Sequence, residues 1–262
     1  MKGRGSTHAG RARTPRDAAV VGRRPALEAI RSGSAREVLV SMSARTTAGL
    51  REVLDAAARL HVPVRRVTDD VIDRIASGTR HQRVAVRVAM PPSLDERALG
   101  SRDWPTDAVV LVLDGVTDPQ NVGAAARTAE AAGAAAMIVR RHRGAPNTSA
   151  TLKTSAGALF HLPVARVTNI TRGLDTLKRA GFWVAGLDAA ASRTIREAER
   201  PPGRLALVVG SEGSGLSRLV RESCDELIAI PLTGKATSLN VAVAAGVGLF
   251  TYADRGNRTE EK

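Results

Sequence analysis

From Ala108 onward the chain alternates short apolar segments with helical patterns, and this alternation constrains the fold more than any other feature. Continuous apolar runs at 108–116 and 204–210 are typical of strands buried on both faces of a parallel sheet. Further strand-like segments follow the same plan, at 135–140, 162–167, 182–189 and 225–232. Strands that alternate with helices favour a mostly parallel sheet with helices on both faces. The sequence therefore predicts an α/β fold for residues 108–255.

A smaller α/β unit is predicted upstream, over residues 18–90. Strands are expected there at 37–42, 62–67 and 83–90, and helices at 25–30, 47–60 and 69–76. The segment 91–107 is Pro-rich, polar and non-periodic, so it is predicted to be a linker between the two units. Residues 1–17 carry five Lys or Arg and are predicted to form a disordered basic tail, with a second tail at 256–262.

The basic composition bears on the partner of the chain. Lys and Arg outnumber Asp and Glu by 39 to 26, which gives a formal net charge of +13. Such a surplus favours a polyanionic partner, most simply nucleic acid. An arginine-rich composition without any such partner is the alternative.

Several classes of function find no support in the sequence. No apolar run reaches the ~18 residues of a membrane span, and no signal-peptide pattern is present, so neither a membrane nor export is expected. The single Cys224 excludes an internal disulfide and suits a reducing cytoplasm. The five histidines lack metal-ligand spacing, so no metal site is expected. The motifs of P-loops, dinucleotide-binding folds and serine hydrolases are also missing.

Three polar stretches follow predicted strands, where open α/β sheets bind ligands. The first, 113–133, places Asn121 near a helix start and Arg127 about two turns later. The second, 207–217, is a glycine-rich turn with one acid, Glu212. The third, 230–246, leads from a polar loop into a helix without any charge, which we expect to be buried on every side. Each stretch also has a purely structural interpretation: an exposed arginine, a tight turn and a capped core helix.

These stretches, DPQNVGAAARTA, VGSEGSGLS and IPLTGKATSLNVAVAAG, resemble the three motifs of the SpoU/TrmH family of RNA ribose 2'-O-methyltransferases, within the SPOUT superfamily. They occur in the family's order over residues 108–255. Upstream, VVGRRPALEAIRSG and TRHQRVAV resemble the small RNA-binding domain of the bacterial 23S rRNA guanosine 2'-O-methyltransferases. Arg83 departs from the glycine that relatives commonly have after His-Gln.

The resemblance implies a trefoil-knotted α/β domain, a homodimer and S-adenosyl-L-methionine as the methyl donor, bent into the knot. It implies cofactor contacts at the backbone around Gly210, Ile230 and Leu239, with Leu187 as a further candidate. It places the reaction around five side chains: Arg127, Asn121, Glu212, Ser238 and Asn240.

The resemblance also bears on mechanism and target. Family proposals give proton abstraction to the arginine that matches Arg127. A guanidinium pKa above about 12 favours another role, in which Arg127 binds a phosphate and stabilises the developing alkoxide. Ser238 and Asn240 are predicted to line the methyl-transfer site, although helix capping explains both nearly as well.

The RNA partner is expected to be 23S rRNA, with a guanosine as the target. Phosphate contacts are predicted for the basic surface, including Arg140, Arg141 and Arg143, and recognition by RNA shape is expected because aromatic residues are few. Two alternatives stay open: an antibiotic-resistance-type methyltransferase with another target nucleoside, and a non-catalytic RNA-binding protein of ribosome assembly.

Overall fold

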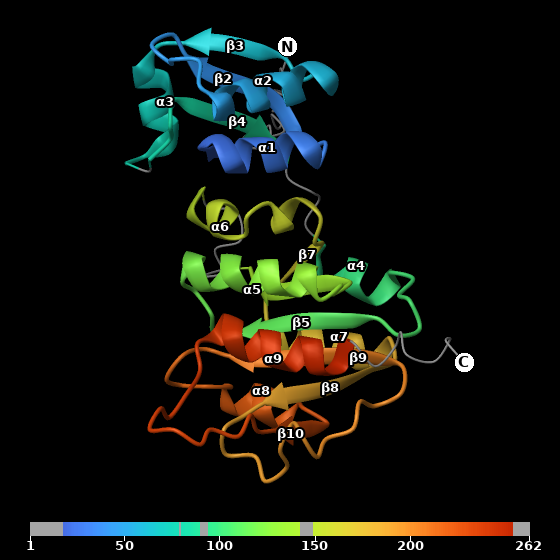
Figure 1. The fold of residues 1–262 in the computed structure, drawn as a ribbon. Coiled ribbons are helices and arrows are strands. Elements are labelled where there is room, and N and C mark those ends of the chain that lie inside the picture. The colour runs from blue at the N-terminus through green and yellow to red at the C-terminus, as the bar shows by residue number, and fades with distance from the viewer. Residues whose placement is uncertain (1–17, 79, 90–93, 142–148, 254–262) are drawn as a thin grey trace, which may run out of the picture.

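The computed structural model describes residues 18–253, apart from 79, 90–93 and 142–148 (Figure 1). The predicted tails at 1–17 and 256–262 lie outside the described residues, as does Arg143. Within the described part, the strands form one four-stranded and one six-stranded sheet. The smaller sheet is built from the N-terminal third of the chain and lies above the larger one in Figure 1.

The smaller sheet has the strand order β1-β4-β2-β3. Its strands are β1 (Ala18–Val21), β2 (Ala35–Ser41), β3 (Val64–Val67) and β4 (Val84–Val88). Helices α1 (Arg23–Arg31) and α2 (Ala48–Arg59) share one apolar core with this sheet, while α3 (Asp69–Ala76) packs on the opposite face. The predicted strands and helices of this unit are confirmed, and β1 is a strand that the sequence pattern did not predict.

The segment predicted as a linker carries a short helix, α4 (Glu96–Ser101), that the sequence did not predict. The Asp95 side chain caps it by accepting a hydrogen bond from the Ala98 N–H at 2.8 Å. Leu99 and Trp104 are buried against the large sheet. The Arg204 guanidinium fixes the end of the segment, because it donates to the carbonyl oxygens of Trp104, Pro105 and Ala180.

The larger sheet is parallel throughout its described pairs, in the order β10-β8-β9-β5-β6-β7. Its strands are β5 (Val109–Asp114), β6 (Ala136–Arg140), β7 (Val164–Val167), β8 (Phe182–Leu187), β9 (Arg204–Gly210) and β10 (Glu226–Ile228). This confirms the predicted α/β fold with a mostly parallel sheet. The carboxyl ends of all these strands lie at one edge, which is where the three polar stretches begin.

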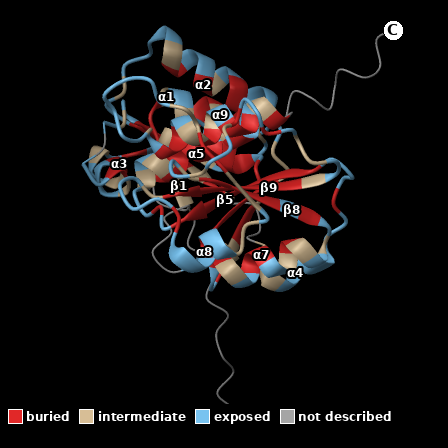
Figure 2. Ribbon diagram, turned by 90° about the horizontal axis from the view of Figure 1, so that it is seen from below, coloured by how far each residue is buried: buried red, intermediate tan, exposed pale blue. Residues whose placement is uncertain are grey.

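Helices cover both faces of the larger sheet (Figure 2). One face carries α5 (Pro119–Ala131), α6 (Ser149–Thr154), the 3-10 helix η1 (Ala158–Phe160) and α9 (Val241–Ala253). The other face carries α4, α7 (Ile170–Arg179) and α8 (Arg218–Glu222). Strand side chains alternate between two cores, because Leu111 and Leu113 face α5 and α9 whereas Val110 and Val112 face α7.

The expectation that the last helix is buried on every side is wrong for the single chain. Leu249 and Tyr252 of α9 are fully buried, but Val243, Val247 and Phe250 are 52%, 36% and 52% exposed. Their spacing places these three side chains on one face of α9. The helix therefore has an apolar face that no described residue covers.

The two sheets are joined by packing as well as by the chain. Helix α6 contacts β1 of the smaller sheet and α5 of the larger unit, and it lies between α1 and α5 in Figure 1. Gly157, at φ 93°, lies against Glu28 of α1 so closely that a Cβ on Gly157 would come within 2.9 Å of the Glu28 Cβ. One apolar core runs through the junction, from Val20 to Leu159.

Candidate active site

The glycine-rich turn after β9 closes on itself. The backbone N–H of Gly215 donates to the Ser211 carbonyl at 2.9 Å, and the Ser211 N–H donates back at 3.2 Å. The two hydroxyls of Ser211 and Ser214 are hydrogen-bonded at 2.6 Å. A Cβ on Gly210 would lie 2.1 Å from the Gly215 carbonyl carbon, so only glycine fits where the strand enters the turn. The compact turn leaves its backbone open to a ligand.

Two aspartates hold the start of α5 and the end of β5 in place. Asp118 caps the helix, because its carboxylate accepts from the N–H groups of Gln120 at 3.3 Å and Asn121 at 3.2 Å. Asp114, at the buried end of β5, accepts from the Ser217 N–H at 2.7 Å. This bond ties the end of β5 to the segment after the glycine-rich turn. Asn121 is thereby held in the first turn of α5, next to Glu212.

Side chains from all three polar stretches meet in one hydrogen-bond network. Asn240 donates through its amide to Oδ1 of Asn121 at 2.9 Å and to Oε1 of Glu212. Asn121 donates to the same Glu212 oxygen at 3.3 Å, and the Val241 N–H donates to it at 3.4 Å. The carboxylate of Glu212 therefore holds the beginnings of α5 and α9 together. Three of the five predicted reaction residues are in direct contact.

The other two predicted reaction residues stand apart from this network. Arg127 is exposed on α5 and has no hydrogen-bond or ion-pair partner within the described part of the chain. Ser238 is exposed on the loop before α9. The alternative role in helix capping applies to Asn240, because its Oδ1 accepts from the Ala242 N–H at 3.0 Å. No described contact gives Ser238 such a role, which leaves its hydroxyl available.

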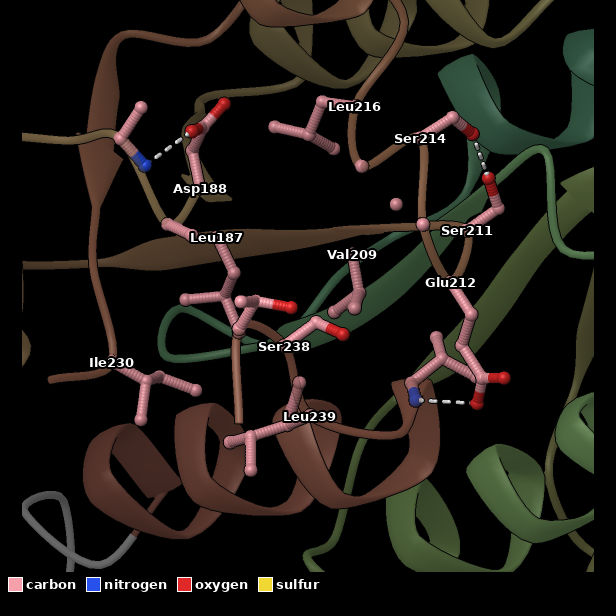
Figure 3. Close-up of a pocket in the computed structure, with 18 of the residues that line it drawn as sticks. Leu187, Asp188, Val209, Ser211, Glu212, Ser214, Leu216, Ile230, Ser238 and Leu239 are labelled. Carbon is pink, nitrogen blue, oxygen red and sulfur yellow. Dashed lines mark hydrogen bonds between the residues drawn. The ribbon is translucent and has the colours of Figure 1, made fainter. Parts of the chain in front are cut away.

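A cavity of about 300 Å³ lies beside the network, between the glycine-rich turn and the loop before α9 (Figure 3). All four residues predicted to contact a cofactor line it, namely Leu187, Gly210, Ile230 and Leu239. Glu212 and Ser238 also line this cavity, whereas Asn121, Arg127 and Asn240 do not. The lining combines the apolar side chains of three strand ends with the exposed backbone of two polar loops. Its size lies at the lower end of the ~300–1,000 Å³ of small-molecule sites.

The cavity has two charged lining residues that the sequence analysis did not single out, Asp188 and Arg221. The Asp188 carboxylate, whose side chain is only 8% exposed, accepts from Arg221 Nε at 2.6 Å and also contacts its Nη2. Its other oxygen accepts from the Ala190 N–H at 2.8 Å, as Figure 3 shows. The position of Asp188 at a strand end was the signal that could have identified it. This ion pair fixes the segment 187–190 against α8.

The described residues include no helix that is long and apolar enough to cross a membrane. Across the same residues, the side chains of His, Cys, Asp and Glu form no group of three or more that could hold a metal ion.

Comparison with known families assigns both parts of the chain. Residues 108–250 match the SpoU rRNA Methylase family, and residues 19–94 match the family described as RNA 2'-O ribose methyltransferase substrate binding. The chain belongs to the SpoU rRNA methylase family. This confirms the resemblance that the three motifs carry.

Individual relatives are similar to this chain over most of its length. The 23S rRNA (guanosine-2'-O-)-methyltransferase RlmB of Vibrio parahaemolyticus is 42% identical over 193 residues, which are 72% of this chain and 76% of the relative. An uncharacterized tRNA/rRNA methyltransferase of Mycobacterium avium is 39% identical over 90% of this chain and 77% of its own length. The crystal structure of the SpoU methyltransferase AviRb from Streptomyces viridochromogenes with AdoMet is similar in fold. It has a TM-score of 0.75 at 26% identity and covers 92% of this chain and 90% of AviRb.

Proposed function

We propose that this protein transfers a methyl group from S-adenosyl-L-methionine to a ribose 2'-hydroxyl of ribosomal RNA, with a guanosine of 23S rRNA as the target. The observation that carries the proposal is the meeting of Asn121, Glu212 and Asn240 beside a cavity of cofactor size. The RlmB relative and the match to a substrate-binding family support the choice of RNA. The net charge of +13 suits the same partner.

The cavity residues fit the cofactor. Leu187, Ile230 and Leu239 supply apolar surface for the adenosine, and the backbone around Gly210 supplies hydrogen-bond groups that no side chain covers. When bound, S-adenosylmethionine supplies an electrophilic methyl group on a sulfonium. The protein's part is to hold the ribose hydroxyl in line with that methyl group and to favour loss of the hydroxyl proton.

Arg127 is assigned the role of binding negatively charged oxygens of the RNA. A guanidinium is a poor proton acceptor, because its pKa exceeds about 12. It is a strong donor to phosphate and to a developing alkoxide oxygen. The Arg127 side chain is exposed and has no partner in the described part of the chain, so it is free to serve an incoming RNA.

The remaining predicted residues position the site. Glu212 holds Asn121 and Asn240 in place, and the amide of either can orient the ribose or Arg127. Ser238 lines the cavity from the opposite loop, where its hydroxyl can reach the methyl-transfer site. These roles deepen the family assignment and are open to test one residue at a time.

A homodimer, a trefoil knot and a cytoplasmic location complete the proposal. The exposed apolar face of α9, formed by Val243, Val247 and Phe250, supports the homodimer, since a second copy would cover it. Sedimentation velocity should give a dimer for the wild type and a monomer for Phe250→Asp. The knot is proposed from family membership, and the cytoplasm from a ribosomal RNA substrate and the unpaired Cys224.

The deciding experiment is methyl transfer from labelled S-adenosylmethionine to rRNA from a strain that lacks this gene, with the methylated ribose mapped by primer extension at low nucleotide concentration. A single stop at a guanosine of 23S rRNA is the expected result. Transfer to another nucleoside would point instead to the resistance-type activity. No transfer to naked rRNA, ribosomal particles or tRNA would overturn the enzymatic proposal in favour of an RNA-binding protein.

A further inference from the structure

Two arginines project from the ends of β6 and β7 on the face that carries α5. The strands pair in parallel, with Val139 opposite Arg166, and the Arg141 N–H donates to the Val167 carbonyl at 2.7 Å. Residues that alternate along a strand share a face, and Val139 and Val164 are both buried in the core under α5. Arg141 and Arg166 therefore lie on this same face, at neighbouring strand ends.

Arg166 has no partner of opposite charge in the part of the chain that the structure describes. Its side chain is partly buried, and its Nε is buried and makes no hydrogen bond. Burial lowers the pKa of the Arg166 guanidinium, and the nearby positive charge of Arg141 lowers it further. Within the described residues, neither arginine pairs with a carboxylate, in contrast to Arg221, which has Asp188.

Two like charges and an unsatisfied buried N–H raise the free energy of the unliganded protein. A bound anion would remove both effects at once. Among anions, a phosphodiester fits best, because the forked guanidinium donates two parallel hydrogen bonds to phosphate oxygens. We propose that Arg141 and Arg166 form a binding site for a backbone phosphate of the substrate RNA.

The position of this site in the sheet suits the binding of a substrate phosphate. This inference rests on the proposed RNA methyltransferase function. Neighbouring strands are about 4.8 Å apart, and β6 and β7 lie one and two strands from β5, so the backbones of Arg141 and Arg166 lie about 5 Å and about 10 Å from the strand that leads into α5. They share the edge of the sheet at which Asn121 and Glu212 meet. The phosphate they bind would belong to a nucleotide that flanks the target ribose.

The test compares Arg166→Met and Arg141→Gln with the matched control Arg172→Gln, in the full chain. Arg172 is an exposed arginine of α7, on the opposite face of the sheet, so its loss removes the same charge elsewhere. Filter binding of 23S rRNA is measured over a range of salt. We expect each site variant to bind RNA about tenfold more weakly, with a salt slope smaller by about 0.7 per lost phosphate contact. The control should match the wild type.

A second measurement separates ligand binding from a structural role. Arg166→Met removes an unsatisfied donor and a like-charge contact, so the melting temperature without RNA should stay the same or rise. S-adenosylmethionine affinity should stay within twofold of the wild type, because neither arginine lines the cofactor cavity. Unchanged RNA affinity and salt slope, or a lower melting temperature in Arg166→Met, would overturn the site. If the wild type methylates no RNA, the proposed enzymatic function fails, while the RNA-binding comparison still decides the phosphate site.

Discussion

The side-chain amide of Asn240 is hydrogen-bonded to the carboxylate of Glu212, which joins the start of α9 to the turn after β9. The two residues are 28 positions apart in the chain, and of the two only Glu212 lines the cavity. Asn121 of α5 completes the contact, so a single carboxylate oxygen receives donors from two helix starts. The site is assembled from three loops, each of which the fold brings to the same sheet edge.

Replacing Glu212 tests whether this carboxylate acts through its shape or through its charge. Glu212→Ala removes the acceptor, and we expect methyl transfer to fall about 100-fold and stability to fall by about 1 kcal/mol. Glu212→Gln keeps an oxygen acceptor but loses the charge-assisted bonds, so a rate loss of about tenfold with wild-type stability is expected. Single-turnover kinetics and thermal unfolding provide the measurements. Equal rates for Gln and wild type would show that the charge is not needed.

Arg127→Ala should reduce methyl transfer by at least about 100-fold, because it removes the group assigned to the phosphate and the alkoxide. Its exposed position without a described partner predicts a stability change within about 0.5 kcal/mol. Binding of S-adenosylmethionine, measured by calorimetry, should be unaffected. Retained methyl transfer in this variant would exclude both roles considered for Arg127.

Gly210→Ala should destroy the cofactor site. The added Cβ would lie 2.1 Å from the carbonyl carbon of Gly215, so the turn must open, at a cost of about 3 kcal/mol or more. Gly234→Ala is the matched control, since a Cβ there meets nothing within 4 Å. Calorimetric titration with S-adenosylmethionine should show no binding for Gly210→Ala and normal binding for Gly234→Ala. Normal binding by both would place the cofactor elsewhere.

The Asp188–Arg221 pair is expected to position the cavity wall. Arg221→Gln leaves the nearly buried Asp188 without its counter-ion, so the segment 187–190 should loosen. We expect the Kd for S-adenosylmethionine to rise about tenfold, or about 1.4 kcal/mol, with little change in RNA affinity. Arg218→Gln on the same helix breaks an exposed pair with Glu222 and should leave the Kd unchanged. If both substitutions raised the Kd equally, the weaker cofactor binding would come from a change in α8 as a whole and not from the Asp188–Arg221 pair.

A pH dependence is predicted for the smaller sheet. Hydrogen bonds from Ser41 and Ser43, and then from Arg83, lower the pKa of Asp69 from 3.8 to about 2. Because the folded pKa is depressed, the stabilisation is present above pH 3.8 and is lost as the pH falls toward 2. Carboxyl NMR titration should give this low pKa, and Asp69→Asn should flatten the acid limb of stability. An Asp69 pKa near 3.8 would contradict the hydrogen-bond network.

Much of the fold followed from local pattern because the parallel strands are long apolar runs. The convergence of Asn121, Glu212 and Asn240 was also predictable, since each follows a strand whose carboxyl end lies at the same edge. The helix α4 was not predictable, because six residues are too few for a periodic pattern. Local pattern did not predict the role of single residues such as Arg83. Its φ of 63° lies in the region that favours the glycine of relatives, while its side chain forms an ion pair with Asp69 at 2.8 Å.

The exposed face of α9 could not be predicted for a different reason. An uncharged apolar helix has the same sequence pattern whether it is buried by its own chain or by a second one. The side-chain bonds of Asp188 and Arg221 were equally hidden, because they link residues 33 positions apart on separate elements. Such pairings depend on tertiary distance, which the sequence of either element does not contain.

Helix α6 packs against both β1 and α5, so the smaller sheet cannot swing freely against the larger one. RNA bound to the smaller sheet would then present its ribose to the cavity at a fixed distance from that contact. Under the proposed function, the target nucleotide would be selected by its distance from an RNA landmark that the smaller sheet binds. One base pair inserted between landmark and target would carry the ribose out of reach without altering any atom that the protein touches.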